Sequence, residues 1–172
     1  MRWKVSDHLL GEINKSNLID ELRERLSAQI DALTHSQRST QAGATHEETR
    51  AEDPKDTRAT EAAYLARGLA GRVEQLKLDY DRLSTVMPLD VGDSDAVEIG
   101  RLVRLVDDDD QAVVYFLLPV AGGELIQSGS IGVRVLSPAS PVSQQMLGRS
   151  VGEDFTVNLP KGEVTFSIEE VI

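Results

Sequence analysis

Apolar residues recur every three or four positions along the first half of the chain. One stripe runs from Ile13 to Leu33, and a second, more regular stripe runs from Ala59 to Leu83. This spacing places apolar side chains on one face of an α-helix. Each helix alone would expose its stripe, so the pattern predicts an antiparallel hairpin in which the two stripes pack together. The stripe residues are Leu18, Ile19, Leu22, Leu26, Ile30 and Leu33, then Ala62, Ala66, Leu69, Val73, Leu76, Tyr80 and Leu83.

The hairpin is predicted to occupy residues 1–87, with its tip at about residues 40–56. The segment from His35 to Asp53 is polar, and the second helix is expected to begin near Pro54 and to be about 45 Å long. Met87 and Pro88 end this half, because proline cannot continue a helix. The sequence assigns residues 1–14 no role other than an extension of the first helix.

The hydrophobic period changes to two after Asp95. Alternation of this kind predicts β-strands, and the segment 88–172 is therefore interpreted as a β domain. The four aspartates from Asp107 to Asp110 are expected to form a solvated turn rather than a metal site, since adjacent like charges repel. A second turn is expected at Gly122 and Gly123. The predicted strands are 97–106, 112–120, 130–136, 151–159 and 164–172.

Charge is distributed unevenly between the two halves. The whole chain carries a formal charge of -11. Residues 88–172 contain 14 acidic and 5 basic residues, whereas residues 1–87 contain 15 and 13. Such an acidic β domain repels phosphate, so we expect no direct sequence-specific binding of nucleic acid. A protein with a basic patch is the expected partner.

Several classes of protein do not fit the sequence. The chain has no cysteine, which excludes disulfides and thiolate metal sites and fits a reducing compartment. No apolar run has the length of a signal peptide or a membrane span, so we expect a soluble, cytoplasmic protein without a membrane partner. The three histidines, His8, His35 and His46, lack metal-ligand spacing. No catalytic triad or nucleotide-binding fingerprint occurs in a suitable context, and we expect no enzyme.

A motif near the C-terminus carries the strongest signal of relationship. It begins with Ser-Pro and a hydrophobic residue, continues to two apolar residues and Gly-Arg, and ends with glycine and an acid. Its residues are Ser140, Pro141, Val142, Met146, Leu147, Gly148, Arg149, Gly152 and Glu153, with Pro160, Gly162, Phe166 and Ile168 following at matching spacing. This pattern resembles the C-terminal domain of the GreA/GreB family of bacterial transcription elongation factors. Ser143 and Glu153 depart mildly from the family pattern.

The resemblance implies an α+β fold: a helical hairpin, or coiled coil, followed by a small FKBP-like, twisted antiparallel β domain. A short helix is expected at residues 142–147. The resemblance also implies that the β domain docks on bacterial RNA polymerase while the hairpin enters the secondary channel. The candidate docking loop comprises Ser137, Pro138, Ser140 and Pro141. The alternative is that these residues merely shape a turn.

In the resembling family, two acids at the hairpin tip complete a Mg²⁺ site in the polymerase. This chain offers five acidic residues there: Glu47, Glu48, Glu52, Asp53 and Asp56. Thr57 and Thr60 stand where the family has its acids, so the tip differs. Asp53 and Asp56 keep the three-residue spacing and are the candidate ligands of a Mg²⁺ shared with the polymerase; the protein is expected to have no cofactor of its own. They also flank Pro54 as a helix cap would. Capping is the simpler account and the expected main role, and the two roles are not exclusive.

Three functional outcomes follow. A competent tip would stimulate transcript cleavage, and an altered tip would occupy the channel and modulate synthesis; the altered tip slightly favours the second. The alternative from another class is a structural adaptor that self-associates through its helical seam, which a polymerase-independent dimer would reveal. A prolyl isomerase is disfavoured, because fold does not imply function and the few aromatic residues do not readily line a pocket.

Overall fold

The computed structural model describes residues 10–45, 58–86, 96–160 and 162–172. The chain forms two compact units. The helical unit is Arg23–Asp81, and the β unit combines Met1–Leu22 with Arg82–Ile172. The ends of both long helices therefore belong to the unit that holds the sheet. The division at residues 87 and 88 stays a prediction.

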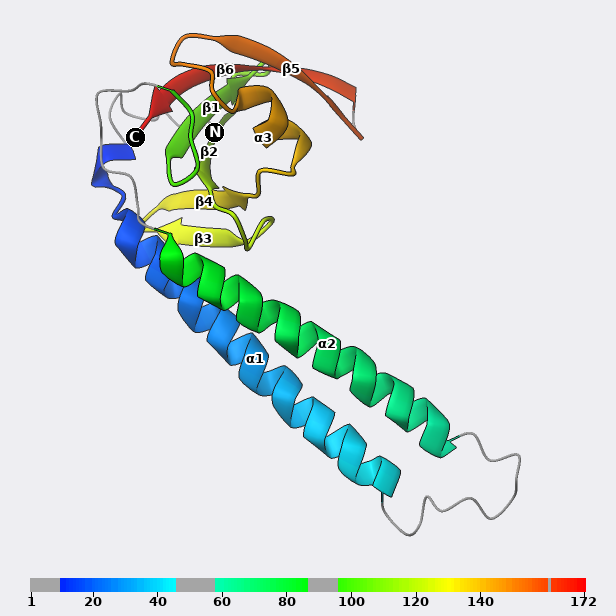
Figure 1. Ribbon diagram of the computed structural model, residues 1–172. Coiled ribbons are helices and arrows are strands. Elements are labelled where there is room, and N and C mark those ends of the chain that lie inside the picture. Colours follow the sequence, from blue (N-terminus) through cyan, green and yellow to red (C-terminus); the bar gives the residue numbers. More distant parts are fainter. Residues whose placement is uncertain (1–9, 46–57, 87–95, 161) are drawn as a thin grey trace. The chain divides into compact units, whose positions relative to one another are not determined.

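Two long helices form the hairpin. They are α1 (Lys15–Thr45) and α2 (Arg58–Thr85), and they run side by side (Figure 1). The side-chain oxygen of Asn14 accepts a hydrogen bond from the Asn17 backbone N–H at 3.1 Å, which satisfies a free donor at the start of α1. Leu10–Glu12 form a separate 3-10 turn, η1. This part of the N-terminal segment is thus no extension of α1, and residues 1–9 lie outside the described residues.

Helix α1 is longer than its apolar stripe. The sequence places residues 40–56 in the tip, whereas α1 continues to Thr45. Polar residues with good helix propensity, among them Gln37, Arg38 and Gln41, carry the helix past Leu33, and no proline interrupts it. The expected start of the second helix at Pro54 lies outside the described residues, and α2 is described from Arg58.

The predicted seam is confirmed in the helical unit. Leu26 on α1 and Val73 and Leu76 on α2 are buried, at the helical spacing that the sequence indicated. Leu69 is only half-buried. The stripe predicts that Leu69 and Val73 are both buried against the first helix; this is confirmed for Val73, whereas Leu69 is only partly buried.

The β unit holds one sheet of six strands in the order β3-β4-β2-β1-β6-β5. Neighbouring strands are antiparallel except β2 and β4, which are parallel. The strands are β1 (Leu102–Asp107), β2 (Ala112–Leu117), β3 (Leu125–Ser128), β4 (Ile131–Leu136), β5 (Asp154–Leu159) and β6 (Gly162–Val171). The α+β class is confirmed, and the sheet is mixed rather than wholly antiparallel.

Two strand predictions need correction. The first predicted strand, 97–106, begins only at Leu102, because Gly100 has a φ of 91° and interrupts the run. The residues before it pair elsewhere: Val97 N–H donates to the Arg149 carbonyl at 2.7 Å. The second correction is strand β3, which the sequence did not predict. It is only four residues long, and the expected turn at Gly122 and Gly123 directly precedes it.

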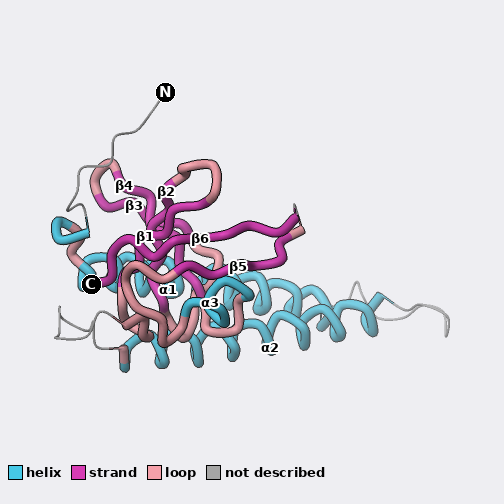
Figure 2. The backbone as a smooth tube through the Cα atoms, turned by 90° about the horizontal axis from the view of Figure 1, so that it is seen from above, coloured by secondary structure: helices cyan, strands magenta, loops and turns pink. Residues whose placement is uncertain are grey.

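Strand β6 is longer than its neighbour β1. Its C-terminal part pairs with β1, and its N-terminal residues pair only with β5. The β5–β6 hairpin consequently projects past the other strands (Figure 2). Short helix α3 (Pro141–Met146) packs against β5. This helix confirms the prediction for residues 142–147.

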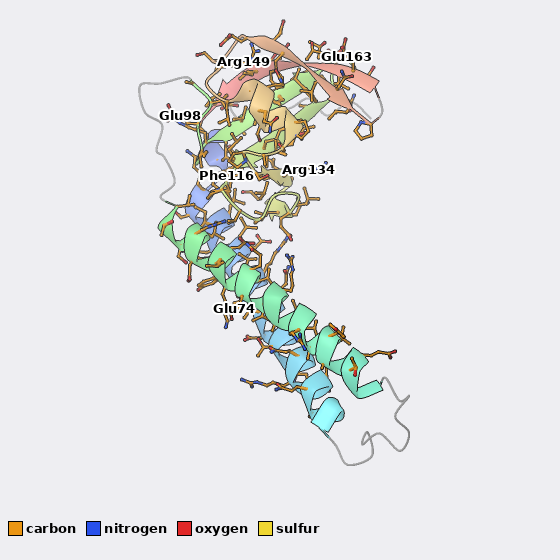
Figure 3. The ribbon with its side chains drawn as sticks, turned by 45° about the vertical axis from the view of Figure 1, so that its right-hand side comes forward. Glu74, Glu98, Phe116, Arg134, Arg149 and Glu163 are labelled. Atoms are coloured by element: carbon orange, nitrogen blue, oxygen red, sulfur yellow. The ribbon has the colours of Figure 1, made fainter. Side chains whose placement is uncertain are left out.

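The core of the β unit has two sides, because successive strand residues face opposite ways. The side covered by α3 includes Phe155 and Phe166, whose ring centroids lie 5.7 Å apart. The other side includes Leu102, Val114 and Phe116 (Figure 3). Apolar side chains from η1, from Ile13 after it and from the ends of α1 and α2 in this unit are buried as well; they are Leu10, Ile13, Leu18, Ile19, Leu22 and Leu83.

Candidate functional site

The predicted acidic residues of the hairpin tip lie outside the described residues. They are Glu47, Glu48, Glu52, Asp53 and Asp56. The choice between helix capping and a metal-linked role for Asp53 and Asp56 therefore stays a prediction. Thr57 also lies outside the described residues. Thr60 is an exposed residue in the first turn of α2, where a hydroxyl cannot replace a carboxylate ligand of Mg²⁺.

The candidate docking loop joins β4 to α3. The Ser140 N–H donates to the Ser137 carbonyl at 3.0 Å and closes a turn. The Ser140 side-chain oxygen accepts from the Ser143 N–H at 3.1 Å, and its hydroxyl donates to the buried Ser143 hydroxyl at 2.9 Å. Pro141 occupies the first helical position, where a missing N–H costs little. Ser140 and Pro141 therefore build the start of α3, which supports the turn-shaping interpretation for these two residues.

A second loop holds the docking loop in place. A Cβ placed on Gly122 would lie 3.0 Å from the Ser137 Cβ and 3.1 Å from the Ser137 nitrogen. Such a Cβ contact would be tighter than ordinary packing, so the Ser137 segment would have to shift by a few tenths of an ångström to accept a side chain here. The Gly123 N–H also donates to the Val135 carbonyl at 2.9 Å. The result is a supported loop on which Ala139 and Pro141 are exposed and Pro138 is half-buried.

Arg149 links the end of α3 to the start of β5 (Figure 3). Its Nε donates to the Gln145 carbonyl at 2.6 Å, and its Nη1 donates to the Asp154 carbonyl at 3.4 Å. The same Nη1 lies 3.8 Å from Glu153 Oε1. Glu153 Oε2 in turn accepts from the Ser150 N–H at 2.6 Å. These motif residues therefore connect neighbouring turns of the chain, and their described partners lie within the β unit.

Glycines of the motif allow the turns between α3 and β5. Gly148 follows the helix cap with a φ of 79°, and Gly152 has a φ of 87°. Glycine adopts this left-handed region without the steric cost of a Cβ. The Gly152 N–H donates to the Ile168 carbonyl at 2.8 Å, which joins the turn to β6. The motif is thus a signature of the fold around α3, and it presents the Ser-Pro loop.

The run of four aspartates forms the β1–β2 turn, as predicted. Asp107 Oδ1 accepts from the backbone N–H groups of Asp109 and Gln111 at 3.0 and 2.8 Å. Asp108 Oδ1 accepts from the Thr165 N–H at 2.8 Å and ties the turn to β6. Two of the aspartates therefore have structural partners. Across the described residues, no group of three or more His, Asp or Glu side chains could hold a metal ion.

Arg101 is a buried cation that the sequence did not reveal. Its side chain is 4% exposed, and Nε and Nη1 have no hydrogen-bond partner within the described part of the chain. The Arg101 carbonyl accepts from the Leu117 N–H at 3.1 Å, so its backbone belongs to the edge of the β1–β2 pair. In the sequence, Arg101 follows Gly100 within the predicted strand 97–106. Nothing in that pattern indicated that its side chain would be buried.

A family model matches the C-terminal half of the chain. Residues 92–172 match the model described as transcription elongation factor, GreA/GreB, C-term. The match includes the whole sheet, α3 and the Ser-Pro loop. The motif at residues 140–153 lies inside it.

Named relatives extend the likeness to the hairpin. The chain is 29% identical to Transcription elongation factor GreA of Sulfurovum sp. over 93% of this chain and 96% of that protein. It is 34% identical to the GreA of Chlorobaculum parvum over 45% of this chain and 46% of that protein. A solved structure, GreA factor homolog 1 (Gfh1) of Thermus thermophilus, is 20% identical, with a TM-score of 0.38, over 87% of this chain and 94% of that one. None of the helices described here is long and apolar enough to cross a membrane.

Proposed function

From the match of residues 92–172 to the GreA/GreB C-terminal model and the likeness to a GreA protein over most of the chain, we propose that this chain is a GreA/GreB-type transcription elongation factor that binds bacterial RNA polymerase and acts at the secondary channel. In this proposal the β domain docks at the channel rim and the hairpin enters the channel. The observation that carries it is the match of residues 92–172, which contains the supported Ser-Pro loop. The protein would act in the cytoplasm and would modify the activity of the polymerase without an active site of its own.

The Ser-Pro loop is the proposed contact with the polymerase. Hydrogen bonds inside the turn and the packing of Gly122 hold the loop backbone, so little conformational entropy would be lost on binding. Ala139 and Pro141 supply exposed surface. The acidic composition of residues 88–172 favours a basic protein surface over nucleic acid.

The tip determines which outcome the protein has. With threonines at positions 57 and 60, we propose that the hairpin modulates synthesis more than it stimulates cleavage. Any Mg²⁺ at the tip would be shared with the polymerase and would involve Asp53 and Asp56. Their capping and metal roles can be separated, because Asp53→Asn keeps a capping side chain and removes the charge, whereas Asp53→Ala removes both. Loss of strong cleavage activity in Asp53→Asn at unchanged stability would show a metal role.

A binding experiment with purified polymerase tests the docking proposal. Ala139→Arg adds a bulky side chain to the exposed part of the loop, and we expect it to weaken binding of the full-length chain about tenfold or more. Asn158→Arg adds the same side chain at an exposed position on β5 and should leave affinity unchanged. Equal affinity of all three proteins would exclude this loop as the contact.

The adaptor alternative has no structural observation in its favour. Its seam would have to be available to a second chain. Leu26, Val73 and Leu76 are instead buried in the single chain. We therefore propose no second function.

A further inference from the structure

Burial divides the helical unit into two segments. We name residues 23–32 and 73–81 the inner segment, and residues 33–45 and 58–72 the outer segment. The inner segment contains the three buried seam residues, Leu26, Val73 and Leu76, at 7, 4 and 2% exposure. In the outer segment, none of the side chains that the structure describes is buried. The segments therefore differ in the contacts that hold their helices together.

On α1 the seam becomes polar where burial ends. Thr34, Gln37 and Thr40 are the half-buried positions that continue the α1 seam beyond Leu33. On α2 the half-buried seam positions of the outer segment are Ala66, Leu69 and Ala70, two of which are small. The larger side chains of Tyr64 and Leu65 are 66% and 57% exposed. Association of the outer helices consequently removes little apolar surface from water.

Two glycines weaken the outer part of α2 further. Gly68 and Gly71 lie inside the helix, and a Cβ placed on either would meet no atom within 4 Å. Close packing therefore does not require glycine at these positions. A glycine in a helix interior is less favourable than alanine, because it loses more backbone freedom on folding.

We infer that the outer segment opens and closes as a separate unit while the inner segment stays folded. The inference combines three independent features: the absence of buried side chains in the described outer residues, the polar α1 side of the seam and the glycine pair. Regions with few buried apolar contacts open locally at a lower free energy than the rest of a protein. The boundary lies at Val73 on α2 and between Leu26 and Leu33 on α1.

Separate opening would let the outer segment exchange between an ordered, closed form and a less ordered, open form. Under the proposed function, on which this step rests, the outer segment would be ordered when it enters the polymerase channel. Binding would then select the closed form from a mixed population. In the free protein the inner segment would stay folded, whereas the outer segment would become ordered on binding.

Hydrogen exchange of the full-length free protein tests the inference. After correction for intrinsic rates, backbone amides of the outer segment should exchange about tenfold or more faster than those of the inner segment. Gly68→Ala and Gly71→Ala should each slow exchange of the outer segment about fivefold, and about 25-fold together. Inner-segment rates should stay unchanged in these variants.

Two alanine-to-glycine variants provide matched controls. Ala63 lies in the outer segment and Ala28 in the inner segment, and both are exposed helix residues. Ala63→Gly should speed exchange of the outer segment alone, and Ala28→Gly should speed exchange of the inner segment alone. Equal exchange of both segments in the wild type, or equal slowing of both by Gly68→Ala with Gly71→Ala, would overturn the inference.

A second arm of the experiment separates this inference from the proposed function. With RNA polymerase added, the outer segment should gain protection. If the free protein behaves as expected but the polymerase protects neither segment, the separate opening stands and the secondary-channel proposal fails.

Discussion

Single atoms decide the geometry of the Ser-Pro loop. A Cβ on Gly122 would be in tight contact with Ser137, and the Ser140 hydroxyl both caps α3 and donates to the buried Ser143 hydroxyl. The sequence motif identified Ser140 and Pro141 but gave no sign of Gly122, because its partner lies in another loop. The local roles of motif residues can be read from spacing, whereas contacts between loops require the fold.

Gly122→Ala should destabilise the β unit by about 1 to 3 kcal/mol, because the added Cβ overpacks against the backbone of Ser137. Urea unfolding of the two proteins measures the difference. Gly132→Ala is the control. Its Cβ would lie 3.6 Å from its nearest neighbours, an ordinary contact, so its cost should be smaller. A neutral effect of Gly122→Ala would show that the two loops separate readily.

Ionisation of the buried Tyr115 hydroxyl is expected to lower the stability of the fold at alkaline pH. Burial raises the pKa of its hydroxyl above 10.0; Arg134 opposes this shift and Asp107 adds to it. The folded state therefore holds the proton more tightly than the unfolded state. Its stabilising contribution is present below pH 10.0 and is lost as pH rises through the folded pKa. Stability should fall above pH 10, and Tyr115→Phe should reduce that fall. An identical alkaline profile in Tyr115→Phe would contradict this assignment.

At the scale of elements, periodicity predicted most of the structure. The seam in both helices follows from the spacing of apolar residues, and the short helix α3 follows from the resemblance that the Ser-Pro motif carries. Three features escaped it: the extension of α1 to Thr45, the four-residue strand β3, and the parallel pairing of β2 with β4. A polar helix, a very short strand and the direction of strand pairing depend on tertiary contacts that a local pattern does not contain.

Leu76→Ala should destabilise the hairpin by about 2 to 5 kcal/mol, because it removes a fully buried side chain from the seam. Leu69→Ala should cost less, since Leu69 is half-buried. Loss of helical circular dichroism in urea compares the two variants. A cost below about 0.5 kcal/mol for Leu76→Ala would mean that it faces solvent and that the seam is not formed.

At the scale of the whole molecule, two different kinds of surface are joined in one chain. The β unit contributes a supported loop in an acidic domain that matches the GreA/GreB C-terminal family model. The hairpin contributes an inner segment with buried seam residues and an outer segment without them in the described residues. The sequence could identify the family from the motif around α3. For the tip, the Asp-Pro-Lys-Asp string favours helix capping as the main role of Asp53 and Asp56, while their three-residue spacing also allows a shared metal site; neither role is tested by the described residues.

Competition for the polymerase tests the central proposal most directly. A labelled GreA bound to bacterial RNA polymerase is titrated with the full-length, unlabelled chain, and its release is followed by fluorescence anisotropy. We expect complete, dose-dependent displacement of GreA, with Ala139→Arg requiring about tenfold more protein than the wild type or Asn158→Arg. Failure to displace GreA at saturating concentrations would contradict the proposal that this chain docks at the secondary channel.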